Sequence, residues 1–459
     1  MLRLRYTRFI MKHAMFLLVM SGALAAADFK AGVARIDITP GGPIWMSGYA
    51  SRKKPSEGAL QRLWAKALAI EDTRKGRAVI VTTDLIGLPR VVSDVVAARV
   101  LKAHGLPRAA LLLNSSHTHT GPVVRPNLIT MYDLDEENDR RITAYTRELT
   151  EKLVTVIGAA LGDLQPARLS YGAGSAGFAM NRREFTPKGV RIGRNPQGPV
   201  DHQVPVLRVA AEDGRLRAVL FAYACHNTTL TGEFYQLSGD YAGFAQEEVE
   251  KAHPGATALF MMLCGGDQNP EPRSRLELAV SHGKTLAAEV SRLVSADLAP
   301  VSGPLRSAFR MTDLSFATHS RETFEKELGD ANPHKVRRAR AMLKAYDQRR
   351  PVRGVLYPIQ AVRFGRGLTL LALGGEVVVD YALRVKKEFG PEEIVVAGYS
   401  NDVMCYIPSL RVLKEGGYEA VDSMIYYGQP GPFAEDVEER VFGGIHAVLK
   451  QVGRAPAKR

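Results

Sequence analysis

Cysteine is scarce in this 459-residue chain, which contains only three: Cys225, Cys264 and Cys405. So small and odd a number of thiols excludes a disulfide framework of the kind that holds small secreted domains together. Long apolar runs are equally scarce, because no segment after the amino-terminal one approaches the roughly 20 apolar residues of a transmembrane helix. With 46% hydrophobic and 24% charged residues, the chain is expected to fold around an ordinary hydrophobic core.

Acidic residues are also in deficit, with 48 against 61 basic residues and a formal net charge of +13. Much of the excess lies between Lys335 and Arg353, where eight basic residues accompany a single acid, Asp347. This segment either attracts an anionic surface, such as lipid headgroups or a cell-wall polymer, or forms the solvated face of an amphipathic helix. No nucleic-acid-binding module accompanies the charge, which argues against nucleic acid as a partner.

The amino-terminal segment has the layout of a secretory signal peptide. Four basic residues precede an apolar run from Met15 to Leu24, and small residues follow this run up to Asp28. We therefore expect residues 1–27 to be a signal peptide and the mature protein to be exported, either periplasmic or secreted. An uncleaved anchor is the alternative, and Met11 is an alternative start.

Strand-like and helix-like segments alternate from residue 28 onward. Apolar runs with strand character cover residues 77–84, 109–117, 217–226, 256–267, 368–376 and 393–402. Helical periodicity appears at residues 92–104, 143–161, 243–253, 276–294, 378–389 and 437–452. This alternation predicts an α/β protein with mixed β-sheets flanked by helices. No linker divides the chain, so we expect residues 28–459 to form a single domain with a charged helical insertion at 320–350.

The apolar runs end in residues that are able to carry chemistry. These residues are Asp84, His117 and His119, His226, Asp267, Glu376, and Asp402 shortly before Tyr406. Ligands of α/β proteins bind beyond the strand ends, where loops converge without disturbing the core. The sequence therefore predicts a site at the strand ends.

Two histidines one residue apart follow the most apolar of these runs, in the stretch LLLNSSHTHTGP. Because alternate side chains of a strand leave the same face, we expect His117 and His119 to point into one cavity. Three interpretations are open: both histidines bind a metal ion, one binds it while the other acts as an acid or base, or both are polar residues packed in the core. Two imidazoles and a carboxylate form a common zinc-binding set, which His117, His226 and Glu376 would supply from three strand ends.

The stretch NSSHTHTGP resembles the signature of the neutral ceramidase family, secreted zinc amidases that release fatty acid from ceramide. Further stretches resemble segments of that family and occur in the same order: GVARIDITP, MSGYA, MNRR, SGDYAGFA, GGDQNP, GGEVVVDYALRV and YSNDVMCYIPSLRVLKEGGYEA. The resemblance extends from about Gly32 to about Gln429, which is nearly all of the expected mature chain. It implies the fold of the ceramidase catalytic domain, with its metal site at the strand ends.

The resemblance implies a role for each matching residue. The zinc ligands would be His117, His226, Glu376 and Tyr406. His119 would transfer a proton or position the substrate, and Arg182 and Tyr418 would contact the substrate carbonyl or the developing oxyanion. The loop that contains Asp267 and Asn269 would contribute to substrate binding. Without the resemblance, Tyr406 and Tyr418 are explained equally well as aromatic side chains that pack in the core. Arg182 is then explained equally well as a residue in an ion pair. The three cysteines adjoin these positions, and we expect them to be small buried residues behind the site.

Two departures from the family pattern bear on the substrate. Asn269 stands where the ceramidases usually carry a serine to which a catalytic part has been assigned, and asparagine cannot be an acyl-accepting nucleophile. A route that uses metal-activated water survives this change, whereas a serine route does not. We also expect the family's carboxy-terminal immunoglobulin-like domain to be missing. Because that domain borders the active site in ceramidases, its expected loss alters the lipid-binding surface and points away from ceramide itself, toward another acylated amine or an ester.

Two functions remain in view. The first is an exported, zinc-dependent hydrolase of an amide bond, in which Zn²⁺ activates water and His119, Arg182 and Tyr418 handle protons and charge. The alternative is a catalytically idle, metal-bearing protein that binds a lipid or glycan in the same pocket.

Overall fold

The computed structural model describes residues 27–457. The predicted signal peptide therefore lies, apart from its last residue, outside the described residues. Within the described part of the chain, no helix combines the length and the apolar character that crossing a bilayer requires.

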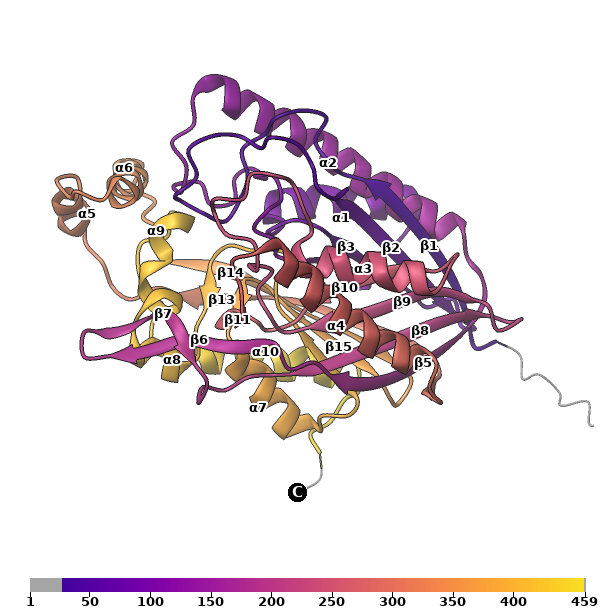
Figure 1. Cartoon of the computed structure of the whole chain (residues 1–459). Coiled ribbons are helices and arrows are strands. Elements are labelled where there is room, and N and C mark those ends of the chain that lie inside the picture. The colour runs from indigo at the N-terminus through magenta and orange to yellow at the C-terminus, as the bar shows by residue number, and fades with distance from the viewer. Residues whose placement is uncertain (1–26, 458–459) are drawn as a thin grey trace, which may run out of the picture.

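Two large β-sheets form the centre of the molecule (Figure 1). The larger sheet contains, in spatial order, β10 (Thr257–Met262), β9 (Leu216–Tyr223), β8 (Gln203–Ala211), β5 (Gln165–Ser175), β1 (Phe29–Asp37), β2 (Trp64–Asp72), β3 (Arg77–Thr83) and β4 (Leu111–Ser115), with β12 (Ala299–Val301) beside β5. The second sheet contains β13 (Leu305–Ser315), β14 (Gly354–Phe364), β15 (Thr369–Leu373) and β17 (Ile394–Ala397). Parallel pairs such as β3–β4, β9–β10 and β15–β17 accompany antiparallel ones, so both sheets are mixed.

Two smaller sheets lie near the strand ends. One contains β11 (Gln268–Pro270), β6 (Ala179–Thr186) and β7 (Gly189–Asn195), and the other pairs β16 (Glu376–Val377) with β18 (Tyr406–Ile407). The helices are α1 (Arg90–His104), α2 (Glu136–Gly162), α3 (Asp240–Ala252), α4 (Leu276–Val294), α5 (Arg321–Glu327), α6 (Pro333–Asp347), α7 (Val379–Phe389), α8 (Leu410–Glu415), α9 (Met424–Tyr427) and α10 (Val437–Gln451). Two further turns are η1 (Arg108–Ala110) and the π-helical η2 (Tyr418–Asp422).

The alternation of apolar residues along the strands explains how these elements form layers. In β3, Ala78 and Ile80 pack against residues of the second sheet, whereas Val79 and Val81 belong to the core beneath α1 and α2. Helices α3 and α4 cover strands β8, β9 and β10 of the larger sheet, on the face that points away from the second sheet. Helices α7 and α10 cover the second sheet. Because successive strand residues point to opposite faces, strands buried on both sides read as nearly continuous apolar runs. This burial accounts for the runs seen in the sequence.

The predicted fold class, α/β with mixed sheets and flanking helices, is confirmed. The charged segment 320–350 forms α5 and α6, which lie at one side of the molecule, at the left of Figure 1. Each of the three cysteines is free and buried, as expected. That residues 28–459 form a single domain stays a prediction.

Candidate metal centre

Side chains at the ends of four different strands meet at one buried point. His117 comes after β4 and His226 after β9, while Glu376 begins β16 and Tyr406 begins β18. Oε2 of Glu376 lies 2.9 Å from Nε2 of His117 and 3.1 Å from Nε2 of His226. The hydroxyl of Tyr406 lies 3.2 Å from the same nitrogen of His226. The structure thus brings together the four residues predicted as metal ligands.

His117 and His119 meet in a way that strand geometry did not anticipate. Strand β4 ends at Ser115, and His117 adopts a left-handed backbone conformation with a φ of 63°. The two side chains share a cavity because the loop turns there, not because they alternate along a strand. Left-handed backbone at a residue other than glycine is strained, and such strain is concentrated at functional sites. Nε2 of His119 lies 3.1 Å from Nε2 of His117.

Backbone carbonyls determine which nitrogen of each buried imidazole carries the proton. Nδ1 of His117 lies 2.7 Å from the carbonyl oxygen of Ile86, and Nδ1 of His226 lies 2.7 Å from that of Gly265. A carbonyl oxygen only accepts hydrogen bonds, so each Nδ1 carries a proton and donates it. In the neutral imidazoles both Nε2 atoms then present lone pairs toward the carboxylate of Glu376.

This arrangement fits a bound cation. Two nitrogen lone pairs and a carboxylate that face one another at about 3 Å repel, unless a positive charge lies between them. The ligands of a tetrahedral zinc ion, each 2.0–2.1 Å from the metal, lie about 3.3 Å apart. Ligand atoms of His117, His119 and His226 all lie within 4.8 Å of one another, so this group could hold a metal ion. His119 is therefore placed either to bind a metal as a third imidazole or to act beside it.

Burial and neighbouring charges set the protonation states at this point. Burial, together with the nearby Arg182 guanidinium, lowers the pKa of His226 to about 3. Burial and the adjacent His117 and His226 hold the pKa of His119 well below its usual value. A carboxylate and unprotonated imidazoles are the forms that a metal requires.

A cavity of about 230 Å³ opens onto the centre. Its lining includes His119, Arg182, Asn269, Tyr406, Tyr418 and Tyr49. His119, Arg182, Tyr418 and Asn269, four of the residues predicted to act on or bind the substrate, therefore line one space next to the predicted ligands. Nδ1 of His119 is buried and has no hydrogen-bond partner among residues 27–457, and the His119 ring contacts the ring of Tyr49 at a centroid distance of 5.0 Å.

Arg182 is held by a network that sequence analysis did not find. Its Nε donates to Oε1 of Glu419 at 2.8 Å, and its Nη2 donates to the hydroxyl of Tyr406 at 2.9 Å. Glu419 is buried and also accepts a hydrogen bond from Nη1 of Arg183 at 2.6 Å. Asn269 accepts from Nη1 of Arg182 at 3.3 Å. The buried carboxylate of Glu419 thus binds both guanidinium groups, and this fixes the direction in which Arg182 points.

Asp267 does not line the cavity. It is fully buried, Oδ1 accepts a hydrogen bond from the backbone N–H of Val379 at 2.8 Å, and Oδ2 accepts from Nδ2 of Asn181 at 3.1 Å. Burial raises the pKa of Asp267 to about 7. In this structure the residue ties the start of α7 to β6, so it supports the site and its oxygens are occupied by protein donors.

Tyr427 is a second residue that the sequence did not reveal. Its hydroxyl donates a hydrogen bond to Oε1 of Glu376, the oxygen that faces away from the two imidazoles. Because ligating carboxylates are oriented by such outer contacts, Tyr427 positions Glu376. No spacing rule links residues 427 and 376, and the contact exists only because α9 packs beside β16.

Comparison with known proteins supports the same conclusion as the motifs. The profile of the family described as "Neutral/alkaline non-lysosomal ceramidase, N-terminal" matches residues 29–300, which is more than half of the chain. The chain belongs to this family. The segment that matches contains His117, His119, His226 and Arg182.

Curated members of the ceramidase family match over part of their length. Neutral ceramidase of Pseudomonas aeruginosa is 27% identical over 282 residues, which cover 59% of this chain and 41% of that protein. Neutral ceramidase of Drosophila pseudoobscura pseudoobscura is 34% identical over 285 residues, which cover 55% of this chain and 38% of that protein. The matched region thus spans about two fifths of the length of these ceramidases.

A solved ceramidase shares the fold over almost the whole chain. The crystal structure of neutral ceramidase from Pseudomonas aeruginosa superposes with a TM-score of 0.71 at 21% sequence identity, and the match covers 94% of this chain and 76% of that one. Because the match covers 94% of this chain, the common fold extends well beyond residue 300, where the match to the family profile ends.

Proposed function

We propose that this protein is an exported, zinc-dependent hydrolase that cleaves the amide bond of an N-acyl lipid of the ceramide type. The observation that carries the proposal is the convergence of two Nε2 lone pairs and the Glu376 carboxylate beside a cavity lined by His119, Arg182 and Tyr418. Membership of the ceramidase family and the names of its curated relatives support the substrate class.

His117, His226, Glu376 and Tyr406 would hold the zinc ion. When bound there, zinc supplies Lewis-acid activation of water at neutral pH. The two carbonyl contacts to Nδ1 orient the imidazoles before any metal binds, and Tyr427 does the same for Glu376. Because these side chains are already oriented, binding a metal ion costs them little conformational entropy, and the affinity for the metal is higher.

His119, Arg182 and Tyr418 would serve the reaction itself. His119 is unprotonated at neutral pH and has a free Nδ1, so it can take up a proton and deliver it to the departing amine. Arg182 presents its guanidinium over the ring of Tyr418 with 5.6 Å between guanidinium carbon and ring centroid, and both residues line the cavity. There they would stabilise the negative oxygen that develops from the carbonyl.

Asn269 would take part without being a nucleophile. It lies in the cavity wall and accepts hydrogen bonds from Arg182 and from the hydroxyl of Thr228, each at 3.3 Å. Its amide therefore helps to orient Arg182. A hydrolysis that uses activated water is consistent with this residue, since no acyl group has to be transferred to position 269.

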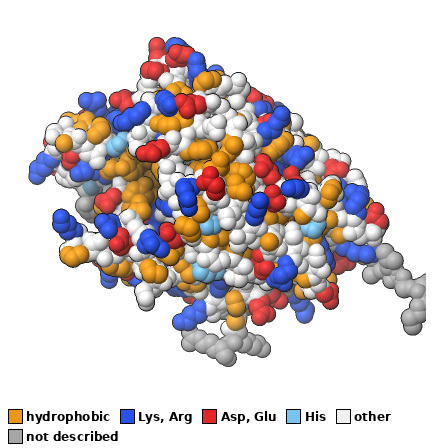
Figure 2. All heavy atoms as spheres, viewed as in Figure 1, with side chains coloured by type: hydrophobic (Ala, Val, Ile, Leu, Met, Phe, Trp, Pro, Cys, Tyr) orange, Lys and Arg blue, Asp and Glu red, His pale blue; other side chains and the backbone are white. Residues whose placement is uncertain are grey.

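The substrate would be reached at a lipid surface outside the cell, after export directed by residues 1–27. Five basic side chains of the segment Lys335–Arg353 are exposed: Arg340, Lys344, Arg349, Arg350 and Arg353. Figure 2 shows basic side chains along the edge of the molecule where α5 and α6 lie in Figure 1. Others are used inside the protein, because Arg338 pairs with Glu327 and Arg337 donates to the carbonyl of Thr130. The exposed group would attract anionic lipid headgroups.

Metal analysis of the unmodified protein and two variants tests the proposal most directly. The purified protein is expected to contain about one zinc per chain, whereas His117→Ala and Glu376→Ala are expected to contain little. Equal metal content in all three proteins would disprove the ligand assignment. Turnover of a ceramide with a fluorescent acyl chain then separates the two functions, since zinc without turnover of any N-acyl substrate would favour the idle, metal-bearing binding protein.

A further inference from the structure

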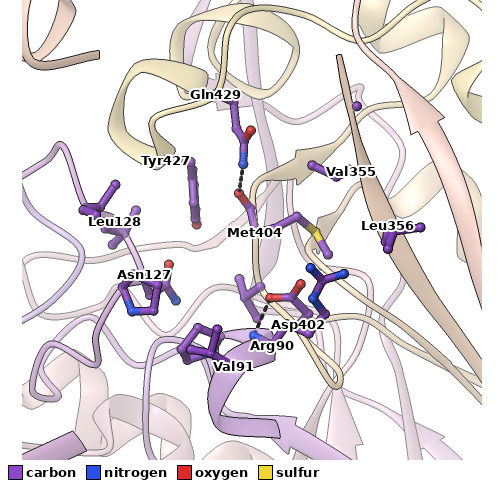
Figure 3. A pocket seen from close by; sticks show the side chains of 15 residues that line it. Arg90, Val91, Asn127, Leu128, Val355, Leu356, Asp402, Met404, Tyr427 and Gln429 are labelled. Carbon is purple, nitrogen blue, oxygen red and sulfur yellow. Dashed lines mark hydrogen bonds between the residues drawn. The ribbon is translucent and has the colours of Figure 1, made fainter. Parts of the chain in front are cut away.

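A second cavity has Tyr427 in its lining (Figure 3). Its volume is about 570 Å³, within the roughly 300–1,000 Å³ typical of small-molecule sites. We call it the Arg90 cleft. Three large apolar side chains from distant segments line it while remaining solvent-exposed: Val91 is 57%, Ile129 is 49% and Leu356 is 44% exposed. Exposed apolar residues that converge on one cavity indicate a ligand or partner site.

One cation faces this apolar space. Figure 3 shows the Arg90 side chain inside the cleft, beside the Asp402 carboxyl group and near Met404 and Leu356. The only ion pair of Arg90 in the described chain is with Asp94, whose carboxylate is 4.0 Å away and mostly exposed. The Arg90 guanidinium is therefore weakly paired and available to a ligand.

Asp402 does not cancel the positive charge of Arg90. It is buried, and Oδ1 accepts a hydrogen bond from the backbone N–H of Arg90 at 2.9 Å. Burial raises the pKa of Asp402 to about 7, against the opposing effect of Arg90. A substantial part of this carboxyl group is thus protonated at neutral pH, and a protonated carboxyl can donate a hydrogen bond to an anionic ligand.

We propose that the Arg90 cleft binds a long-chain fatty acid, with its carboxylate on Arg90 and its alkyl chain against Val91, Ile129 and Leu356. A guanidinium group forms paired, charge-assisted hydrogen bonds with a carboxylate. Its positive charge repels a long-chain amine, which is the other single-tailed amphiphile that cleavage of the amide bond releases. The apolar walls supply the free energy of chain burial, at about 25 cal/mol per Å² of apolar surface. A fatty acid is also the product class of the proposed function, but binding at the cleft does not require that the protein be a hydrolase.

The cleft and the metal centre share one wall. The ring of Tyr427 lines the cleft, and its hydroxyl donates to Oε1 of Glu376. The neighbouring residue, Tyr426, lines the catalytic cavity instead. An alkyl chain in the cleft therefore packs against the residue that orients Glu376, without entering the space where His119 and Arg182 lie.

Displacement of a fluorescent fatty acid by palmitate from the full chain tests the proposal. Val91→Glu places a negative charge in the cleft, and Val95→Glu is its matched control, because Val95 lies on the same helix, is 46% exposed and is not part of the cleft. We expect Val91→Glu and Arg90→Gln to weaken palmitate binding by about tenfold or more, and Val95→Glu by less than about twofold. Binding of hexadecanol should respond to Val91→Glu and remain insensitive to Arg90→Gln.

Two further variants separate this proposal from the proposed function. His117→Ala, which is expected to lose metal and turnover, should bind palmitate as the unmodified chain does. Ile192→Glu places a charge at the mouth of the catalytic cavity, and it should leave palmitate binding unchanged. Absence of palmitate binding, equal loss in Val91→Glu and Val95→Glu, or loss in Ile192→Glu alone would each overturn the proposal; the last result would place the fatty acid in the catalytic cavity. Far-ultraviolet circular dichroism confirms that each variant is folded.

Discussion

Substitution of Gly48 by alanine is expected to displace His119 without removing any chemical group from the site. Gly48 has a φ of 96°, and its N–H donates to the hydroxyl of Tyr132 at 2.7 Å. An added Cβ would lie 2.4 Å from Nδ1 of His119, whereas ordinary contact begins at 3.4 Å. The His119 ring must therefore move by about 1 Å, since the backbone at Gly48 is anchored by its hydrogen bond.

The size of the effect follows from that displacement. A catalytic group that is misplaced by about 1 Å costs on the order of 100-fold in rate, which corresponds to about 2.7 kcal/mol of transition-state stabilisation. The left-handed backbone costs an alanine a further 1–2 kcal/mol or so of folding free energy, which a protein of ordinary stability tolerates. We expect a folded protein whose kcat/KM for an N-acyl substrate is about 100-fold lower.

Steady-state hydrolysis and bound zinc are measured together for Gly48→Ala. Gly41→Ala is the control, because an added Cβ at Gly41 meets no atom within 4 Å and its backbone is not left-handed. Unchanged kcat/KM in Gly48→Ala would refute the assignment of His119 to the reaction. Zinc is expected to remain at about one per chain, and its loss would instead show that His119 is a metal ligand.

Three further outcomes are expected. Tyr427→Phe removes the donor to Oε1 of Glu376, and a competition titration with a chelator should show zinc affinity about 10- to 100-fold lower with the fold intact. Asp402→Asn should remove a pH dependence of stability. The carboxyl pKa is raised from 3.8 to about 7 on folding, so the native state retains a proton that the unfolded chain releases, and the free energy of unfolding falls between about pH 4 and pH 7 and levels off above. That fall is on the order of 4 kcal/mol at most, and urea unfolding at a series of pH values should show a fall smaller by this amount in the variant than in the unmodified chain, because Asp267, whose pKa burial also raises to about 7, keeps its own contribution. Lys66→Met should destabilise the protein by about 2–3 kcal/mol, because Nζ of Lys66 is buried and donates to Glu250 and to a backbone carbonyl, each at 2.8 Å. An unchanged midpoint of guanidinium unfolding would contradict that value.

Several features of the fold follow from local sequence patterns. The run at residues 77–84 and the helical stretch at 92–104 correspond to β3 and α1, and helix α4 spans the predicted residues 276–294. These elements could be predicted because their apolar periodicity records which faces are buried, and because turn residues such as Gly105, with a φ of 66°, end them locally. The placement of chemistry-bearing residues after strands was likewise visible, since strand ends are where polar side chains can converge.

Only the tertiary structure decided how those residues face one another. The left-handed backbone at His117, the carbonyl contacts that set the imidazole protons, and the hydrogen bond from Tyr427 to Glu376 all depend on packing between segments far apart in the chain. The Arg90 cleft is of the same kind, because it gathers residues near positions 90, 129, 356, 402 and 427. The apolar periodicity of a segment reflects the environment of that segment alone. It carries no information about which distant segments line the same cavity. The sequence by itself therefore determined the elements and the chemistry available at their ends, and packing of two sheets and their helices decided the geometry in which that chemistry meets.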